Sequence, residues 1–309
     1  MHELTAYQAW HTTRFEIDLS KPKVMGIVNV TPDSFATRTM TSERSAHSAK
    51  HWIQNSIDHA ACQVQEGAHV LDIGAESSRP GAATVGMEEE WSRLQPILKE
   101  LMTWEVPISV DTYKPEIMQR ALDMGVDIIN DIWALRQAQA LQVITRFDCG
   151  VCLMHMHAEP ASMQVSPMRG DVMQDVSTFL DERVQACLDG GIERRRLILD
   201  PGIGFGKTVE QNFTLLQRQN ELHRYDLPLL VGWSRKSSLG AVTGLDVEKR
   251  GTSSVVAAVL AFERGAQVVR VHDVASTLQG LQVWLHASGL ESEHPRALSK
   301  AKGTPLYTD

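Results

Sequence analysis

Short runs rich in Val, Ile and Leu recur along the chain, and longer segments with apolar residues three or four positions apart separate them. Near-continuous apolarity over so few residues is typical of parallel strands buried on both faces, whereas the wider spacing is typical of amphipathic helices. The predicted strands are 23–30, 69–74, 107–112, 127–132, 150–156, 196–202, 228–234 and 267–273. The predicted helices are 46–66, 87–105, 115–124, 134–147, 172–189, 210–223, 252–264 and 275–286.

The alternation of strands with helices predicts an α/β fold in which the strands close into a single (β/α)₈ TIM barrel. A chain of 309 residues suits this fold, because such barrels use roughly 250 residues around one core. We expect the barrel over residues 23–287, after an extension over 1–22 whose last part caps the bottom of the barrel. The tail over 288–309 lacks apolar periodicity and is expected to be flexible.

The charge balance is acidic, since 30 Lys and Arg residues face 38 Asp and Glu residues for a net charge of −8. This balance argues against nucleic acid as a partner, because binding the phosphate backbone requires a basic surface. Residues 1–20 lack the pattern of a signal segment, and the longest apolar run, 255–262, is far shorter than the ~20 residues of a membrane span. The sequence therefore predicts a cytoplasmic protein with no membrane segment.

The cysteines are few and scattered, which argues against a disulfide framework. Cys149 and Cys152 form a CxxC pair, a spacing also found in zinc and redox sites. The pair lies inside a strand-like apolar run and no second pair accompanies it, so we interpret both residues as structural.

Every predicted strand ends in polar residues, and the carboxyl ends of barrel strands meet at one mouth, where catalytic residues of this fold lie. Asp111, Asn130 and Asp200 would bring acceptors and an amide to that mouth. Such a set suits the donor-rich edge of a planar heterocycle such as an aminopyrimidine. A structural alternative is that strand-end Asp residues cap the helices that follow.

A second polar group follows the last two predicted strands. Ser234-Arg235-Lys236-Ser237 and Arg270-Val271-His272 place positive charge where barrels commonly hold phosphate, and strand alternation puts Arg270 and His272 on one face. This group favours a phosphorylated substrate. Arg235 is interpreted as a solvated surface cation.

The segment 202–208, Gly-Ile-Gly-Phe-Gly-Lys-Thr, is rich in glycine but matches neither common nucleotide-binding pattern. Pro201 stands where the Walker A pattern needs a glycine, and Lys207 stands where the Rossmann pattern needs one. We interpret it as a tight loop whose backbone approaches a ligand. His155 and His157 lie on a predicted strand with no carboxylate nearby in sequence, which favours a core or supporting role over metal binding.

Several of these strand ends together resemble the signatures of the dihydropteroate synthase family. They are Met-Gly-Ile-Val-Asn-Val-Thr-Pro-Asp-Ser-Phe at 25–35, Asp-Ile-Gly-Ala-Glu-Ser-Ser-Arg-Pro-Gly at 72–81 and Asp-Pro-Gly-Ile-Gly-Phe-Gly-Lys at 200–207. The segments 234–237 and 270–272 match as well, in the family's order. The resemblance spans about residues 23 to 283, which makes it more specific than any single motif.

The resemblance implies a transferase of folate biosynthesis. It also implies a homodimer, the usual form of this family. Such an enzyme joins 6-hydroxymethyl-7,8-dihydropterin diphosphate to 4-aminobenzoate, with Mg²⁺, and yields 7,8-dihydropteroate and diphosphate. It implies that Lys236, Arg270, Asp111 and Asp200 act as the catalytic residues, with Asn29 as the metal ligand. The implied pterin contacts are Asp111, Asn130, Asp200 and Lys236, and the implied diphosphate contacts are Asn29, Arg270 and His272.

The remaining substrate contacts are implied by the same resemblance. Met154 and Phe205 would pack near the pterin and the aminobenzoate, and two loops, 31–39 and 77–82, would close over the aminobenzoate. Its pocket would be formed by Phe35, Ser78, Arg79, Pro80 and Ser237. Pro32 and Gly232 are also assigned to substrate binding.

The first of these loops departs from the family pattern. After Phe35 the family usually continues Ser-Asp-Gly-Gly, whereas this chain has Ala36-Thr37-Arg38-Thr39. The change leaves open a paralogue that binds the pterin but turns over weakly. A methyltetrahydrofolate-dependent methyltransferase shares the pterin-binding barrel, but it has no need for the cationic segments 234–237 and 270–272.

Overall fold

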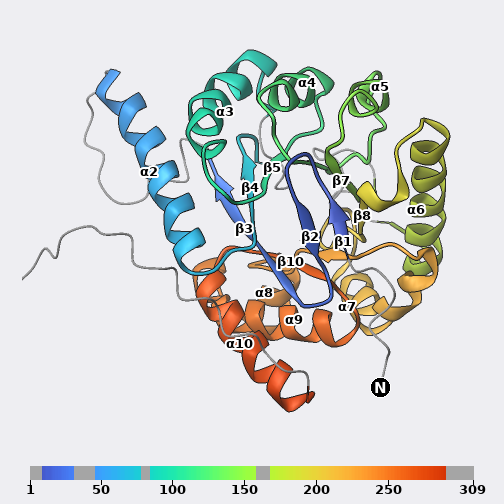
Figure 1. Cartoon of the computed structure of the whole chain (residues 1–309). Coiled ribbons are helices and arrows are strands. Elements are labelled where there is room, and N and C mark those ends of the chain that lie inside the picture. The colour runs from blue at the N-terminus through green and yellow to red at the C-terminus, as the bar shows by residue number, and fades with distance from the viewer. Residues whose placement is uncertain (1–8, 31–45, 78–83, 158–167, 290–309) are drawn as a thin grey trace, which may run out of the picture.

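The computed structural model, which describes residues 9–30, 46–77, 84–157 and 168–289, contains a closed barrel of parallel strands (Figure 1). Neighbouring strands follow the order β8-β7-β6-β5-β4-β3-β10-β9, and a parallel bridge between Leu199 and Leu229 joins β8 to the segment that leads into β9. The barrel strands are β3 (Lys23–Asn29), β4 (Val70–Gly74), β5 (Ile108–Asp111), β6 (Ile128–Asp131), β7 (Gly150–Met154), β8 (Leu197–Asp200), β9 (Leu230–Val231) and β10 (Val268–Val271). The predicted (β/α)₈ barrel is confirmed.

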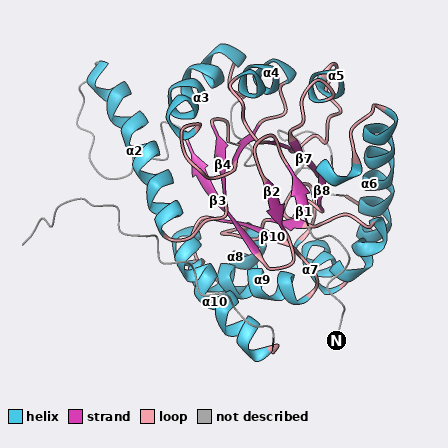
Figure 2. Cartoon of the chain, viewed as in Figure 1, coloured by secondary structure: helices cyan, strands magenta, loops and turns pink. Residues whose placement is uncertain are grey.

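Helices surround the strands on the outside of the barrel (Figure 2). They are α2 (Ala46–Gln65), α3 (Met87–Leu101), α4 (Pro115–Asp123), α5 (Ala140–Ile144), α6 (Val172–Asp189), α7 (Val209–Gln217), α8 (Ser237–Thr243), α9 (Gly251–Glu263) and α10 (Val274–Ala287). Short 3₁₀ turns are η1 (Arg194–Arg196), η2 (Gln219–Tyr225) and η3 (Val247–Lys249). None of the helices in the described ranges is long and apolar enough to cross a membrane.

Alternation along the strands separates two sets of side chains. Residues facing outward, among them Val24, Leu71 and Val110, pack with the helices in the larger core cluster. Residues facing inward near the amino ends of the strands form a second apolar cluster. This cluster fills the lower half of the barrel with Met25, Val70, Ile128, Cys152, Ile198, Leu230 and Val268.

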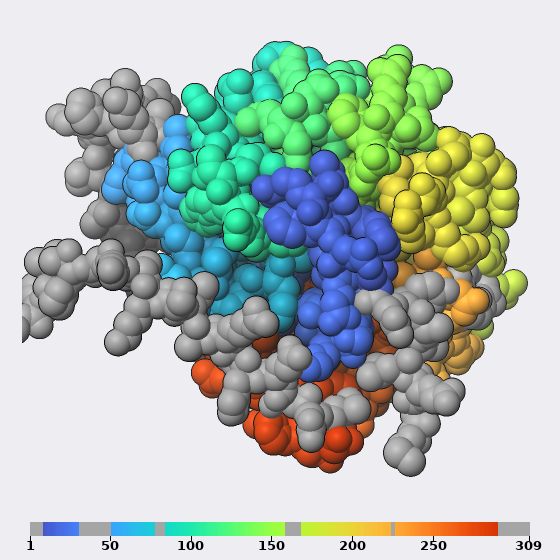
Figure 3. Space-filling view, viewed as in Figure 1, coloured from blue at the N-terminus to red at the C-terminus, as the bar shows by residue number. Residues whose placement is uncertain are grey.

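The segment before the barrel forms an antiparallel hairpin of β1 (Ala9–His11) and β2 (Glu16–Asp18) across the amino ends of the strands (Figures 1 and 3). Trp10 is fully buried with the inward apolar cluster, and its Nε1 donates to the carbonyl oxygen of Arg196 at 2.9 Å. A β-carbon at Gly150 would lie 3.0 Å from that nitrogen, so the glycine makes room for the indole ring. The cap predicted for the last part of the extension over 1–22 is thus this hairpin, and it begins as early as Ala9.

The connection after β6 differs from the prediction of a helix over 134–147. Only α5 is helical there, because Asp131 holds the residues between itself and α5 in a tight turn. Its two carboxylate oxygens accept from the backbone N–H groups of Trp133 and Leu135, each at 2.7 Å. Ala134 and Leu135 adopt φ values of 52° and 57°, which a helix does not allow. The sequence analysis also missed α8, which begins at Ser237.

Candidate active site

The inward positions above the apolar cluster carry charge. The register of β3, β4, β5, β6 and β10 places Asp72, Asp111, Asn130 and Arg270 on the inner face of the barrel. Arg270 Nε donates to Asp72 Oδ2 at 2.6 Å, and Arg270 Nη2 donates to Asp111 Oδ2 at 2.8 Å. Asn130 Nδ2 donates to the same oxygen of Asp72 at 3.1 Å. These four side chains therefore form one network across the barrel.

Burial sets the protonation of this network. It raises the pKa of Asp111 to about 7, although the nearby Arg270 guanidinium opposes the rise. Asp72 is completely buried, and its Oδ1 has no hydrogen-bond partner among the described residues. A buried carboxylate oxygen without a hydrogen-bond donor costs free energy. A ligand that donates to Asp72 Oδ1 would recover part of that free energy.

Asp72 is the residue of this network that the sequence analysis did not assign to the site. It begins the segment 72–81 that resembles the family signature, but that segment does not reveal its partners. The available signal was alternation, since Asp72 and Gly74 both face inward and Gly74 is paired with Asp111. A β-carbon at Gly74 would lie 3.5 Å from that of Asp111, so the glycine leaves room for the carboxylate.

Asp200 lies at the end of β8 beside the network. Its Oδ1 accepts from the backbone N–H of Gly202 at 2.7 Å. Burial raises the pKa of Asp200 to about 6, opposed by this hydrogen bond and by the charges of Lys236, Lys207 and Arg270. The carboxylate is therefore largely ionised at neutral pH and presents a buried acceptor at the mouth.

Lys236 and Phe205 lie together, and Lys236 is close enough to Asp200 to influence its charge. The Lys236 ammonium is 4.1 Å from the centre of the Phe205 ring, a cation–π contact. Phe205 also belongs to an apolar cluster at the mouth with Met154, Met156 and Ile132, against which Tyr113 and Trp133 pack. The mouth thus combines ionised side chains with an apolar wall that suits a flat ring.

The cationic residues predicted to bind an anion after the last two strands have different partners in the structure. Ser234 Oγ lies 2.9 Å from His272 Nδ1, which fixes the imidazole near the end of β10. Arg270 does not share these partners, because its guanidinium binds the carboxylates of Asp72 and Asp111. Arg235 is partly exposed and pairs with Asp273 at 2.7 Å, so it is not the fully solvated cation expected. Ser237 is the first residue of α8, and Gly232 follows β9.

Some predicted contacts cannot be placed. Pro32, Phe35, Ser78, Arg79 and Pro80 lie outside the described residues. Asn29 ends β3, where it is paired with Gly74 on the inner face of the barrel. No group of three or more His, Cys, Asp or Glu side chains suited to a metal occurs within the described ranges.

The surroundings of His155, Cys149 and Cys152 fit the supporting and structural roles predicted for them. His155 is buried and lies 2.8 Å from the ammonium of Lys207, so it supports the loop after β8. Cys149 and Cys152 are buried and free, and they lie on opposite faces of the strand because they are three residues apart. Their buried thiols, whose pKa values burial raises, fit structural residues.

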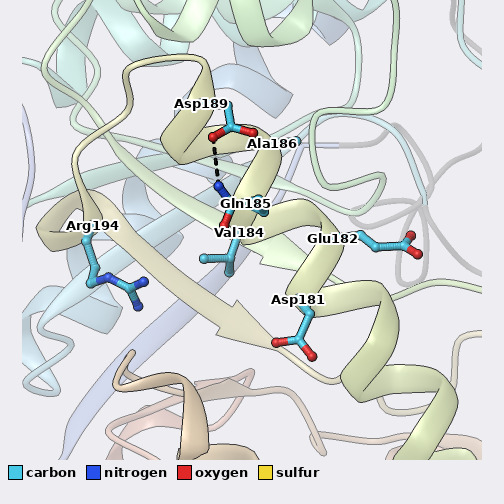
Figure 4. Close-up of a pocket in the computed structure, with 7 residues that line it drawn as sticks. All are labelled: Asp181, Glu182, Val184, Gln185, Ala186, Asp189 and Arg194. Atoms are coloured by element: carbon cyan, nitrogen blue, oxygen red, sulfur yellow. Dashed lines mark hydrogen bonds between the residues drawn. The ribbon is translucent and has the colours of Figure 1, made fainter.

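A separate groove lies on the outer surface of α6, away from the mouth (Figure 4). Gln185 Nε2 donates to Asp189 Oδ1 there at 2.7 Å. The groove is lined by Asp181, Glu182, Val184, Gln185, Ala186, Asp189 and Arg194. None of these residues belongs to the predicted site, and the candidate site remains the mouth of the barrel.

Comparison with known proteins shows the family of the chain. Residues 25–272 match the family model described as pterin binding enzyme. The dihydropteroate synthase of Neisseria meningitidis serogroup C is 46% identical over 283 residues, which cover 90% of this chain and 97% of that protein. The solved Burkholderia cenocepacia dihydropteroate synthase, complexed with 7,8-dihydropteroate, has a TM-score of 0.81 and 42% identity, covering 91% of this chain and 96% of that one.

The Xanthomonas albilineans dihydropteroate synthase, solved with 4-aminobenzoic acid, has a TM-score of 0.81 and 42% identity. This likeness covers 89% of the present chain and 96% of that chain. Sequence and structure agree over nearly the whole barrel. The chain belongs to the dihydropteroate synthase family of pterin-binding enzymes, transferases of folate biosynthesis.

Proposed function

We propose that the barrel mouth joins 6-hydroxymethyl-7,8-dihydropterin diphosphate to 4-aminobenzoate, with the pterin on the Asp111, Asn130 and Asp200 side. The observation that carries the proposal is the cluster of buried acceptors at the inner strand ends. Relatives with similar folds are solved with 7,8-dihydropteroate and with 4-aminobenzoic acid, which supports both substrates. The aniline nitrogen would form a bond to the pterin methylene carbon, the bond from that carbon to the diphosphate oxygen would break, and the aniline nitrogen would lose one proton to water.

The acceptors suit the donor edge of a pterin. Asn130 uses its Nδ2 on Asp72, which leaves its Oδ1 as an acceptor for a ligand. Asp200, ionised at neutral pH, would accept from two adjacent N–H groups of the pyrimidine ring, as a carboxylate does in a bidentate pair. Lys236 would donate to the acceptor atoms on the other side of the ring while it stays over Phe205.

Arg270 and His272 would hold the departing diphosphate. The bonds to Asp72 and Asp111 use two of the five N–H groups of Arg270, so the guanidinium keeps donors for an anion. Asp72 and Asp111 fix its position before substrate arrives, which stabilises developing negative charge without reorganisation.

Asn29 would hold Mg²⁺ through its amide oxygen. A single protein oxygen at the mouth fits an ion that takes most of its ligands from substrate phosphates and water. When bound, Mg²⁺ would neutralise the diphosphate and make it a better leaving group. Ser237 and Phe205 would border the aminobenzoate, together with Phe35 and the segment 78–80.

Asp200→Asn tests the assignment. The variant keeps the size of the side chain but loses its charge, so we expect the affinity for the pterin diphosphate to fall by roughly 1.5–3 kcal/mol, or about 10- to 150-fold. Isothermal titration calorimetry at pH 7.5 measures the affinity. Asp189→Asn, on the outer groove of α6, is the matched control. Wild-type affinity in Asp200→Asn would refute the assignment.

Turnover is tested separately, because the segment 36–39 departs from the family pattern. Purified protein with both substrates and Mg²⁺ should release diphosphate only when 4-aminobenzoate is present. Tight pterin diphosphate binding without release would favour a weakly active paralogue.

We also propose that the chain forms a homodimer through the face of α9 and α10. Val256 and Val283 are 53% and 71% exposed there, and a β-carbon at Gly280 would touch Val255 and Val259 across the two helices. We take these exposed valines as part of the contact surface, since burying them against a second copy would remove apolar area from water. Val283→Glu should shift the mass measured by light scattering from dimer to monomer, whereas Val242→Glu, on α8, should not. The cytoplasmic location stays a prediction.

A further inference from the structure

The glycine-rich loop after β8 is shaped by its neighbours in the protein. Gly202, Gly204 and Gly206 all have positive φ values, between 67° and 83°. A β-carbon at Gly202 would collide with the carbonyl oxygen of His155, and one at Gly206 would lie 2.6 Å from the carbonyl oxygen of His157. The sequence predicted that the backbone of this loop approaches a ligand, whereas the close approach in the structure is to the backbone that follows β7.

Lys207 ends this loop with its side chain turned inward. The residue is only 3% exposed. Its ammonium donates to the carbonyl oxygens of Gly202 and Phe205, at 2.8 and 3.3 Å, and lies 2.8 Å from His155 Nδ1. An ammonium has three N–H groups, so these contacts match its donors. The geometry closes the loop on itself and ties it to β7.

The same ammonium is connected to the proposed pterin site on both sides. Gly202, whose carbonyl oxygen it binds, donates its N–H to Asp200 Oδ1 at 2.7 Å. Phe205, the second carbonyl partner, carries the ring under Lys236. A substitution at Lys207 would therefore disturb a carboxylate and an aromatic ring that face the ligand, although Lys207 itself touches neither substrate.

We propose that Lys207 is a positioning residue of the synthase, which fixes Phe205 and supplies buried positive charge behind Asp200. The inference rests on the proposed role of Asp200 in pterin binding. Lys207 keeps the carboxylate ionised for the ring edge, and His155 stays neutral so that its ring nitrogen accepts from the ammonium. The loop motif therefore serves the site through its lysine as well as through its glycines.

Electrostatics agree with this geometry. Burial and the charge of Lys236 lower the pKa of Lys207 to about 7, although Asp200 opposes this, so Lys207 is charged in the acid range where Asp200 titrates. Burial and the charges of Lys207, His157 and Arg136 lower the pKa of His155 to about 2, so it is a neutral acceptor. Lys236, Lys207 and Arg270 all favour ionised Asp200, so loss of one cation raises the pKa of that carboxyl further.

The test compares Lys207→Met with Lys207→Gln. Both variants lose the charge, but glutamine keeps N–H donors for the two carbonyl oxygens, so it preserves the loop if methionine prevents folding. The affinity for the pterin diphosphate is measured by calorimetry between pH 5.5 and 8.5. We expect about tenfold weaker binding. The pH below which affinity is lost, the acid limb of the affinity profile, should move upward by on the order of one pH unit, because the pKa of Asp200 rises. Lys249→Met, at an exposed lysine, is the matched control.

If Lys207 had only a structural role, its loss would lower the yield of folded protein, or the affinity equally at every pH, and would leave the acid limb of the affinity profile in place. That result in Lys207→Gln would overturn the proposal. In the double variant Asp200→Asn, Lys207→Gln the Lys207 effect on the limb should vanish. Asp200→Asn alone tests the proposed function. If that variant binds as the wild type does, the Asp200 assignment fails, whereas an unmoved limb in Lys207→Gln counts against Lys207 only.

Discussion

The two ends of the barrel interior contrast in chemistry although the same strands build both. At the amino ends, the inward side chains are apolar, and the β1–β2 hairpin seals them with Trp10. Two residues further along β4 and β10, the inward positions are Asp72 and Arg270, and they form ion pairs in a buried environment. One end is filled and closed, whereas the other keeps polar groups that a substrate can complete.

This difference shows how one fold separates stability from chemistry. Burying apolar surface stabilises the barrel, while burying a charge costs free energy unless partners compensate it. Asp127 at the closed end pairs with Arg14 and accepts from the backbone N–H of Ile108. Asp72 at the open end leaves Oδ1 without a partner among the described residues. Substitutions at the two ends should therefore have different consequences.

Trp10→Ala should give the largest effect on stability. Removing a fully buried indole at the closed end leaves a cavity, so the free energy of unfolding should fall by about 3–5 kcal/mol. The KM for either substrate should stay within about twofold of the wild-type value well below the melting temperature. Urea denaturation and steady-state kinetics measure both. A large change in KM would break the proposed separation of the two ends.

Asp111→Asn should show the reverse pattern. Affinity for the pterin diphosphate at pH 8 should fall by roughly 1.5–3 kcal/mol, because a charged acceptor is lost. The free energy of unfolding should not fall as it does in Trp10→Ala, since Arg270 keeps Asp72 as its partner and the variant no longer buries the charge of Asp111. Calorimetry and denaturation together measure this, and a stability loss as large as that of Trp10→Ala would contradict it.

The same variant sharpens the comparison through pH. Burial raises the folded-state pKa of Asp111 from 3.8 to about 7, so protonation favours the folded state and wild-type stability falls as the pH rises between these values. Asparagine cannot titrate, and the decline between pH 5 and 7 should be shallower in Asp111→Asn. Equal slopes would show that Asp111 does not titrate in this range.

Asp131→Asn, at the rim of the open end, should lower stability less than Trp10→Ala does. Asparagine offers one acceptor oxygen where aspartate serves the N–H groups of Trp133 and Leu135, so one N–H loses its partner. The free energy of unfolding should fall by about 1–3 kcal/mol. Chemical denaturation measures the change, with Asp123→Asn on the exposed face of α4 as control. No loss would mean that the turn does not depend on this carboxylate.

Much of the barrel follows from local patterns. The apolar runs locate all eight strands, and the two-residue alternation puts Asp111, Asn130 and Asp200 at the mouth. The helix predicted over 134–147 was too long, because only 140–144 is helical and apolar spacing does not reveal the turn that Asp131 holds before it. The boundaries of β9 were also too wide, since a two-residue strand carries almost no pattern of its own.

The sequence by itself determined the fold class, the family and the strand ends that supply the site, because those depend on periodicity and on motifs contiguous in the chain. Only the tertiary structure decided the pairing of Arg270 with Asp72 and Asp111, residues 198 and 159 positions apart. It also decided the burial of Lys207 against His155. The reason is physical: the free energy of an ion pair or a buried ammonium depends on distance and on exclusion of water, which arise only when the barrel closes.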